Sequence, residues 1–274
     1  MPDLEANLRA LQEWFKDKES VLVALSGGVD SSLVAAVAKK ALGDRAIAVT
    51  EKSPTLPSEE FRAAKKVAEE IGIELVVVKA NELANPNFAK NPTNRCYYCK
   101  SELVSKLRQV AKERGIATIV DGTNASDLGA HRPGTRAMRK GGCRSPLAEL
   151  GIGKEEIREL ARHMRLSAAD RPSMACLASR FPYGMKLTAL DLRRVADAEC
   201  FLRKRLGIRQ LRVRDHSGVA RIEVGREERK LFFREGVMDE VHAKLKSLGF
   251  SYVTLDLRGY RSGSMDEGLD QKKD

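Results

Sequence analysis

The sequence predicts an α/β protein in which helices flank a parallel sheet, followed by a smaller α+β domain. Short apolar runs at 21–25, 46–50, 73–78 and 116–120 alternate with stretches of helical character. That alternation is typical of parallel strands joined by right-handed crossover helices. A turn with two adjacent glycines follows the first run, at the sheet edge where such folds bind ligands. After residue 180 the order of strands and helices changes.

The helices of the first domain, 1–180, are predicted from the spacing of apolar residues and from helix start and stop signals. The Ala-rich stretch 33–40 ends in basic residues, as the helix dipole favours. Pro57 and two acidic residues open the next helix. We expect helices at 3–17, 33–40, 57–71, 99–114 and 154–164, with aperiodic loops at 81–94, 131–134 and 141–147.

The second domain, 181–274, begins after a stretch rich in small residues at 172–184. A long helix over 188–205 leads to two strands, 211–215 and 219–224, which a turn at His216-Ser217-Gly218 joins as a hairpin. A helix over 226–247 and a strand over 252–257 complete the expected α+β domain.

The composition is that of a globular protein that buries a core, with 42% hydrophobic and 32% charged residues among 274. No apolar run is long enough to cross a bilayer, and the first residues lack the pattern of a signal peptide. We therefore expect a cytoplasmic protein without a membrane partner. The net charge of +11 is spread along the chain, which suits anionic nucleotides, RNA or a solvated basic surface.

The glycine turn after the first strand is the leading candidate for a phosphate site. Two glycines let the backbone approach a ligand closely, and the amides and hydroxyls at the helix start can hold an anion. The pattern is neither a Walker loop nor a dinucleotide fingerprint. It resembles the SGGxDS loop of PP-loop ATP pyrophosphatases, although an ordinary glycine turn is the alternative. The candidate ATP-binding residues are Ser26, Gly27, Gly28, Asp30, Ser31 and Ser32.

A second polar loop, Asp121-Gly122-Thr123-Asn124, follows the fourth predicted strand. The carboxyl ends of parallel strands lie at one edge of the sheet, so Asp121 is placed to contact adenosine or substrate. PP-loop proteins commonly carry a similar element there. Asp121 could equally serve only as a turn former.

The chain has an odd number of cysteines, and disulfides are rare in the reducing compartment expected for it. The five are Cys96, Cys99, Cys143, Cys176 and Cys200. Cys96-x-x-Cys99 with Cys176 can hold a [4Fe–4S] cluster and leave one iron open to a sulfide ligand. A structural zinc ion with Cys143 or His131 as fourth ligand is the second interpretation. Three free thiols are the third, and Cys200 is expected in the core.

Arginines alternate along the predicted hairpin. Arg212 and Arg214 share one face of their strand, and Arg221 and Glu223 alternate along the partner strand. Gathered guanidinium groups suit a phosphate because each binds two oxygens at once. A solvated face with cross-strand ion pairs is the alternative.

Several motifs together resemble the LarE family of sulfur transferases. They are Ser26-Gly-Gly-Val-Asp-Ser31, His131-Arg-Pro-Gly134, Cys176-Leu-Ala-Ser-Arg-Phe-Pro-Tyr-Gly184, Arg212-Val-Arg214, Ala220-Arg-Ile-Glu223 and Tyr252-Val-Thr-Leu-Asp256. The resemblance implies a PP-loop (adenine nucleotide α-hydrolase-like) fold and an ATP- and Mg²⁺-dependent enzyme. Its substrate would be pyridinium-3,5-biscarboxylic acid mononucleotide, converted to thiocarboxylates for the nickel-pincer nucleotide of lactate racemase.

The resemblance also implies roles for single residues. In one branch a lone cysteine at the position of Cys176 gives up its own sulfur. The present Cys96, Cys99 and Cys176 resemble the branch whose three cysteines carry a [4Fe–4S] cluster that receives sulfide from a donor. Arg212 and Arg214 would bind the nucleotide phosphate. Glu199 and Glu223 would lie near the site as metal contacts, although a further family acid has no match around Lys230. A homo-oligomer is also expected.

A tRNA thiolase is the main alternative function, because some of these enzymes join the same loop to a three-cysteine cluster. Basic residues are not concentrated in one domain and no RNA-binding module is evident, so a nucleic-acid partner is not expected. An ammonia-dependent amide synthetase would leave the cysteines without a role. A non-catalytic nucleotide-binding module would bind ATP without releasing pyrophosphate.

Overall fold

The computed structural model describes residues 4–127, 133–172, 175–261 and 263–265. The chain separates into two compact units, one of Met1–Phe88 with Asn94–Met174 and the other of Ala89–Thr93 with Ala175–Asp274. The segment 89–93 therefore belongs with the second unit, which the sequence did not suggest. A division of the chain into domains at residue 180 stays a prediction.

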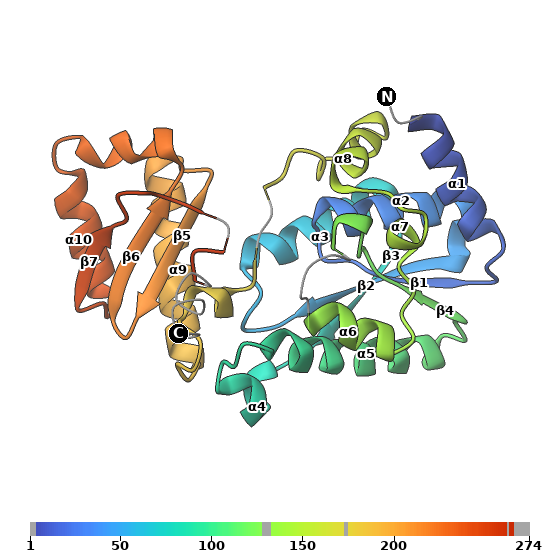
Figure 1. Cartoon of the computed structure of the whole chain (residues 1–274), viewed down its shortest axis with the longest axis horizontal. Helices are drawn as coiled ribbons and strands as arrows, with labels where there is room; N and C mark the ends of the chain where they lie inside the picture. Colours follow the sequence, from blue (N-terminus) through green and yellow to red (C-terminus); the bar gives the residue numbers. More distant parts are fainter. Residues whose placement is uncertain (1–3, 128–132, 173–174, 262, 266–274) are drawn as a thin grey trace, which may run out of the picture. The chain divides into compact units, whose positions relative to one another are not determined.

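The first unit is built on a four-stranded parallel sheet with the strand order β3-β2-β1-β4 (Figure 1). β1 (Val21–Ala24) lies between β2 (Ala46–Lys52) and β4 (Thr118–Val120), and β3 (Glu74–Lys79) pairs with the outer side of β2. This arrangement confirms the predicted α/β class and its parallel sheet.

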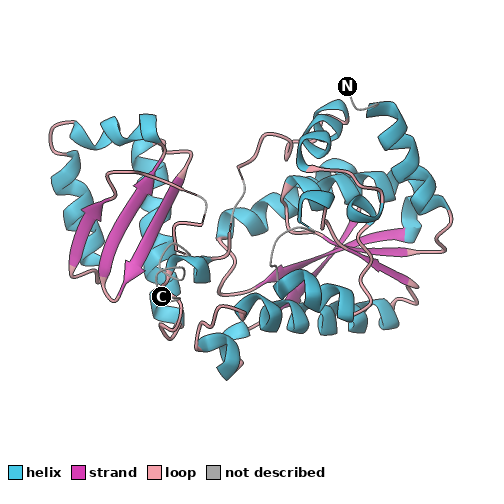
Figure 2. Ribbon diagram, viewed as in Figure 1, coloured by secondary structure: helices cyan, strands magenta, loops and turns pink. Residues whose placement is uncertain are grey.

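Helices cover both faces of this sheet (Figure 2). On one face α1 (Leu4–Lys16), α2 (Val29–Leu42), α3 (Ser58–Ile71) and α8 (Lys154–His163) pack in one core with Val21 and Val23. On the other, α5 (Arg95–Glu113) and α6 (Pro133–Lys140) pack with Leu22 and Ile47. Successive strand residues point to opposite faces, so a strand covered on both sides requires an unbroken apolar run.

Three local predictions for the first unit were wrong. The expected loop at 81–94 holds two short helical segments, η2 (Glu82–Ala84) and α4 (Pro86–Ala89). The Asn85 side chain accepts a 3.0 Å hydrogen bond from the Asn87 amide, so the Asn-Pro pair starts a helix here. α5 begins at Arg95, four residues earlier than expected. α6 begins inside the expected loop 131–134, and the short α7 (Pro146–Glu149) begins inside the expected loop 141–147.

The second unit contains a three-stranded sheet in the order β5-β6-β7. β5 (Leu211–His216) and β6 (Val219–Val224) form the predicted antiparallel hairpin, and β7 (Tyr252–Leu255) runs parallel to β6. Ser217 and Gly218 both have positive φ in the turn, as a two-residue hairpin with right-handed twist requires. α9 (Ala189–Leu206) packs against β5.

The helix predicted over 226–247 is two separate elements. A 3₁₀ helix, η5 (Arg226–Phe233), is followed by α10 (Val237–Ser247). Arg234 is extended and Gly236 has φ +73°, a left-handed conformation that interrupts any continuous helix. No helix within the described ranges has the length and apolar character needed to span a membrane.

Candidate functional site

The glycine loop of residues 26–32 lies at the carboxyl end of β1 and opens α2. Gly27 has φ +81°, and a Cβ atom there would lie 2.7 Å from the Ala64 amide nitrogen and 3.0 Å from the Glu60 carbonyl oxygen. Only glycine therefore allows α3 to pack against the loop. Gly28 is extended and precedes α2, and no described side chain caps the start of that helix. Its first amides thus face an anion-binding position without a competing side-chain acceptor.

Serine hydroxyls line the same loop. Ser26 Oγ and Ser31 Oγ lie 3.0 Å apart, and Ser31 Oγ also accepts a hydrogen bond from the Ser26 amide. Ser32 Oγ donates to the Gly28 carbonyl over 2.8 Å. These contacts fix the backbone turn in a closed form. The structure therefore brings together all the predicted loop residues.

The loop that carries Asp121 packs directly on the start of α2. A Cβ atom on Gly122 would lie 2.6 Å from the Ser31 amide nitrogen, so the two loops touch through their backbones. Asp121 Oδ1 accepts hydrogen bonds from the Thr123 amide at 3.0 Å and from Ser145 Oγ at 2.8 Å. The first of these contacts is an Asx turn. A contact of Asp121 with adenosine stays a prediction.

Two basic residues that sequence reasoning missed also contact the glycine loop. Lys154, at the start of α8, places Nζ 2.7 and 2.5 Å from the two carboxylate oxygens of Asp30. Arg171 donates to the Gly27 carbonyl oxygen at 2.6 Å and pairs with Glu60 at 2.6 Å. Neither belongs to a local motif, because each reaches the loop from more than a hundred residues away.

Cys96 and Cys99 occupy the first turns of α5, three residues apart and hence on one side of the helix. Cys96 is exposed and Cys99 is half-buried. Cys176 is a free, half-buried thiol of the second unit, immediately before the 3₁₀ helix η4 (Leu177–Arg180). Its carbonyl oxygen accepts hydrogen bonds from Ser179 Oγ at 2.8 Å and Arg180 at 3.3 Å.

The remaining cysteines differ from these three in their surroundings. Cys143 is buried, and its burial, followed by the nearby charge of Asp121, raises the pKa of its thiol to about 11. Cys143 is therefore a protonated thiol at neutral pH, a poor zinc ligand as it stands. His131, the other proposed zinc ligand, lies outside the described residues. Cys200, expected in the core, is half-buried on α9.

In the second unit Arg180 and Glu199 form an ion pair that is almost fully buried, with side chains 0% and 1% exposed. Four hydrogen bonds fill both oxygens of Glu199: two from Arg180 at 2.8 and 3.1 Å, one from Arg203 at 2.9 Å and one from the Val213 amide at 3.0 Å. Burial alone would raise the pKa of the Glu199 carboxyl, but Arg180 outweighs it and lowers that pKa to about 2.

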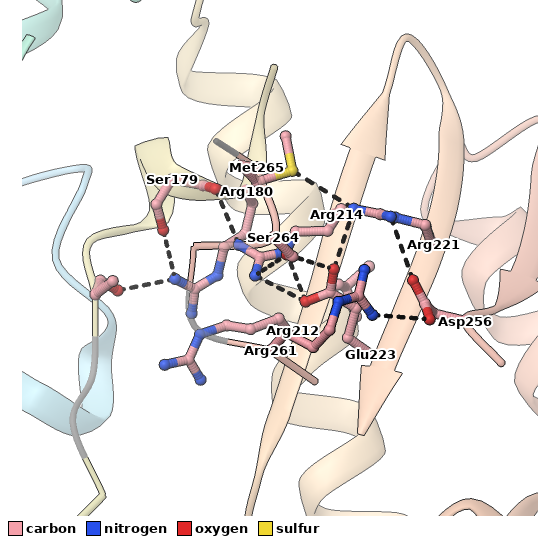
Figure 3. Close-up of polar contacts among 12 residues, drawn as sticks. Ser179, Arg180, Arg212, Arg214, Arg221, Glu223, Asp256, Arg261, Ser264 and Met265 are labelled. Atoms are coloured by element: carbon pink, nitrogen blue, oxygen red, sulfur yellow. Dashed lines mark hydrogen bonds and ion pairs between the residues drawn. The ribbon is translucent and has the colours of Figure 1, made fainter. Parts of the chain in front are cut away.

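A second buried network surrounds Glu223 (Figure 3). Its Oε2 accepts two hydrogen bonds from Arg214, at 3.0 and 2.7 Å. Its Oε1 accepts from Ser264 Oγ at 2.8 Å and lies 3.1 Å from Arg221. Glu223 is 0% exposed and Arg214 is 5% exposed, so this part of the sheet face is not solvated, whereas the cross-strand ion pair that the alternative also expected is present between Arg214 and Glu223.

Arg214 also links this network to the segment that carries Cys176, because its Nη1 donates to the Ser179 carbonyl oxygen at 3.0 Å. Arg212, only 3% exposed, donates to the Leu211 carbonyl and stacks 5.2 Å from the centre of the Tyr260 ring. Burial, followed by the charge of Arg180, lowers the pKa of the Arg212 guanidinium to about 10, so it stays cationic at neutral pH.

Glu199 and Glu223 were predicted to contact a metal ion. In the structure every carboxylate oxygen of both residues is already bonded to arginine, serine or a backbone amide. A metal ion at either carboxylate would have to displace a guanidinium group. Such a contact stays a prediction, and so does the binding of a phosphate by Arg212 and Arg214.

Comparison with known proteins identifies the relatives of this chain. A family model described as NAD synthase matches residues 6–119. Pyridinium-3,5-bisthiocarboxylic acid mononucleotide synthase of Lactiplantibacillus plantarum is 38% identical over 270 residues, which are 98% of this chain and 97% of that protein. The chain belongs to the LarE family. The predicted resemblance, PP-loop fold and ATP-dependent sulfur transferase class are thereby confirmed.

Two other relatives of this LarE-family chain differ in how much of the chain they match. An uncharacterized protein of Synechocystis sp. is 46% identical over 266 residues, 97% of this chain and 99% of that protein. A glutamine-hydrolyzing GMP synthase chain of Archaeoglobus fulgidus is 27% identical over 173 residues, 60% of this chain and 56% of that protein. The likeness to GMP synthase is thus partial, whereas the LarE likeness is nearly end to end.

Proposed function

We propose that the protein converts the carboxylates of pyridinium-3,5-biscarboxylic acid mononucleotide to thiocarboxylates, with ATP as the activating substrate. The product would serve the biosynthesis of the nickel-pincer nucleotide. The observation that carries this proposal is the nearly end-to-end likeness to a synthase whose name states that product. A cytoplasmic location and a homo-oligomeric assembly belong to the same proposal.

The first step activates a carboxylate. A carboxylate oxygen attacks the α-phosphorus of ATP, the bond to the bridging oxygen of the β-phosphate breaks, and pyrophosphate leaves. The amides at the start of α2 and the hydroxyls of Ser26, Ser31 and Ser32 would hold the departing pyrophosphate, because oriented dipoles stabilise charge as it develops. Mg²⁺ would enter with ATP as its phosphate counter-ion, and Lys154 adds positive charge beside Asp30.

The mononucleotide phosphate would be bound by Arg212 and Arg214 of the second unit. Guanidinium groups bind phosphate through paired hydrogen bonds, and both side chains are held in place by burial. Arg214 is anchored by Glu223 and by the Ser179 carbonyl, which fixes its orientation relative to the Cys176 segment. These contacts would hold both guanidinium groups in place before substrate arrives.

The sulfur site would be formed by Cys96, Cys99 and Cys176, three thiols of which none is fully buried. Their number and chemistry fit a [4Fe–4S] cluster, which when bound supplies one iron atom open to an external sulfide ligand. A sulfur nucleophile from a sulfide donor then attacks the activated acyl carbon, and AMP leaves. Repetition at the second carboxylate gives the bisthiocarboxylate.

Anaerobic reconstitution tests the sulfur site. Iron, sulfide and zinc would be quantified in the wild type, in Cys176→Ala and in Cys200→Ala as a matched control on α9. We expect about four irons per chain in the wild type and the control, and their loss in Cys176→Ala. Bound zinc, or Cys176 converted to dehydroalanine after turnover, would instead indicate a structural site or a sacrificial sulfur.

The net charge of +11 keeps a tRNA thiolase as the second candidate. Phosphate contacts make nucleic-acid affinity fall steeply as salt rises. Tight, salt-sensitive tRNA binding without mononucleotide binding would favour this alternative. We expect tight binding of the mononucleotide and no salt-sensitive binding of tRNA.

A further inference from the structure

Three potential metal ligands of the first unit, Glu51, Glu82 and Cys99, meet although they lie far apart in the sequence. Glu51 is near the carboxyl end of β2, Glu82 opens η2 after β3, and Cys99 is on α5. One carboxylate oxygen from each glutamate and the Cys99 sulfur lie within 4.8 Å of one another. No motif in the sequence predicted this group.

The two carboxylates are buried without enough hydrogen bonds. Glu82 is 1% exposed; its Oε1 accepts from Thr55 Oγ1 at 2.7 Å and lies 3.9 Å from the Cys99 sulfur. Within the described ranges, buried Oε2 of Glu82 and buried Oε1 of Glu51 have no hydrogen-bond partner. Two neighbouring carboxylates withdrawn from water are costly unless a cation or a proton balances them.

Nearby lysines do not supply that balance. Lys100 and Lys106 act on Glu51 electrostatically and favour its charged form, but no ion pair joins either lysine to Glu51 within the part of the chain that the structure describes. Burial, followed by the charge of Glu82, raises the pKa of the Glu51 carboxyl to about 7. The two carboxylates therefore lie beside a thiol and keep buried oxygens that have no hydrogen-bond partner among the described residues.

We propose that Glu51, Glu82 and Cys99 form a binding site for one divalent cation of the zinc or ferrous class. A thiolate with two carboxylates is a mixed donor set that suits such borderline ions rather than Mg²⁺ or Ca²⁺. Ligand bonds of about 2.0–2.3 Å require the ligand atoms to lie roughly 3–4 Å apart, so small side-chain rotations close the present group around an ion. Three protein ligands leave a fourth position for water.

Thr55 acts as a positioning residue in this site. Its hydroxyl donates to Glu82 Oε1 at 2.7 Å and so fixes the carboxylate beside the Cys99 sulfur, which lies 3.9 Å from the same oxygen. The site goes beyond the proposed function and does not depend on it. Because Cys99 is also a proposed cluster ligand, a divalent ion here and an iron–sulfur cluster would be mutually exclusive at this thiol.

The test uses the full-length protein, freed of metal under anaerobic conditions and titrated with Co²⁺ as a spectroscopic probe for zinc-type sites. Cys99→Ser, Glu51→Gln and Glu82→Gln alter the proposed ligands. Cys96→Ser and Cys176→Ser are matched controls that remove the other cluster thiols and leave this site intact. Circular dichroism verifies that each variant is folded.

We expect one Co²⁺ per chain with thiolate-to-cobalt charge-transfer absorption in the wild type and in both controls. Cys99→Ser should lose the charge-transfer band, and each glutamine variant should bind at least tenfold more weakly. Loss of the band in Cys96→Ser or Cys176→Ser would overturn the proposal, and so would unchanged affinity in both glutamine variants. Cobalt binding as expected, together with no thiocarboxylate formation by a separate, cobalt-free sample reconstituted with iron and sulfide, would refute the proposed function alone.

Discussion

Arg180 shows at the scale of a single residue how the second unit balances buried charge. Its guanidinium is completely buried and bonded to Glu199 and to the carbonyls of Ala175 and Cys176. Taking a charge out of water is tolerated only when a partner and hydrogen bonds replace the solvent. The Cys176 segment is therefore held in place by this ion pair.

Replacing Glu199 by Gln should destabilise the protein by about 3–5 kcal/mol, because Arg180 would stay buried without its counter-charge. The pKa of Glu199 is about 2 in the folded state against an ordinary value of 4.5. Its contribution to stability is thus complete above pH 4.5 and is lost as the pH falls from there toward 2. Urea unfolding between pH 7 and pH 3 measures both effects.

The exposed Glu227 offers a control, since Glu227→Gln should change the free energy of unfolding by less than about 0.5 kcal/mol. The wild type should lose stability toward pH 3 more steeply than Glu199→Gln. Equal pH dependence in the two proteins would contradict the role of this ion pair.

Cys143 should react slowly with iodoacetamide at pH 8, because burial raises the pKa of its thiol to about 11 and the thiolate is the reacting form. The exposed Cys96 of the same protein is the internal control. Mass spectrometry of labelled peptides reports both rates. Labelling of Cys143 as fast as Cys96 would contradict a buried, protonated thiol and revive the zinc alternative.

The hairpin residues show how far sequence reasoning reaches at this scale. Alternation correctly placed Arg212 and Arg214 on one face of the strand. It could not reveal that α9 packs against β5, and so missed the burial of both arginines. Lys154 and Arg171 were missed because tertiary structure alone brings them to the glycine loop.

At the scale of elements, the two polar loops at the carboxyl edge of the first sheet act as one structure. The backbone of Gly122 touches the first turn of α2, and Asn124 Nδ2 donates to Asp30 at 3.4 Å. A change in one loop therefore displaces the other.

Gly122→Ala should destabilise the first unit by about 1–3 kcal/mol, because its Cβ would lie 2.6 Å from the Ser31 amide nitrogen, a backbone atom that cannot easily yield. The rate of pyrophosphate release should also be lower in Gly122→Ala than in the wild type. Thr123→Ala, in the same loop, should change stability by less than about 0.5 kcal/mol. Thermal unfolding compares them, and equal melting temperatures for the two variants would show that the loops are not coupled.

Strands and long helices were predicted well because their apolar patterns repeat over many residues. The shorter elements were not. α6 has few buried residues, and α4 depends on the Asn85 cap. The interruption between η5 and α10 depends on the left-handed Gly236, whose conformation the helical pattern around it does not reveal.

At the scale of the whole molecule, we assign ATP to the first unit and the mononucleotide phosphate to the second. The family was predicted from motifs spread along the chain, and a relative that matches nearly the full length of the chain confirms that prediction. The Glu51–Glu82–Cys99 group could not be predicted, because three separate elements bring its members together.

This assignment predicts separable kinetic effects. Arg212→Met should raise the KM for the mononucleotide at least tenfold and leave the KM for ATP unchanged, since a charged hydrogen bond to phosphate is worth about 1.5–3 kcal/mol. Lys154→Met should raise the KM for ATP and leave the KM for the mononucleotide unchanged. Arg258→Met, at an exposed position, is the control. Steady-state pyrophosphate release at varied concentrations of each substrate measures both constants, and parallel changes in both would contradict the assignment.

The most direct test of the proposed sulfur transfer is a single anaerobic incubation. The reconstituted protein, ATP, Mg²⁺, a sulfide donor and pyridinium-3,5-biscarboxylic acid mononucleotide are combined, and product mass and pyrophosphate are measured together. We predict replacement of one oxygen by sulfur at each carboxylate, with one pyrophosphate released per sulfur. Pyrophosphate release without sulfur in the nucleotide, or release that requires tRNA, would contradict the proposed function.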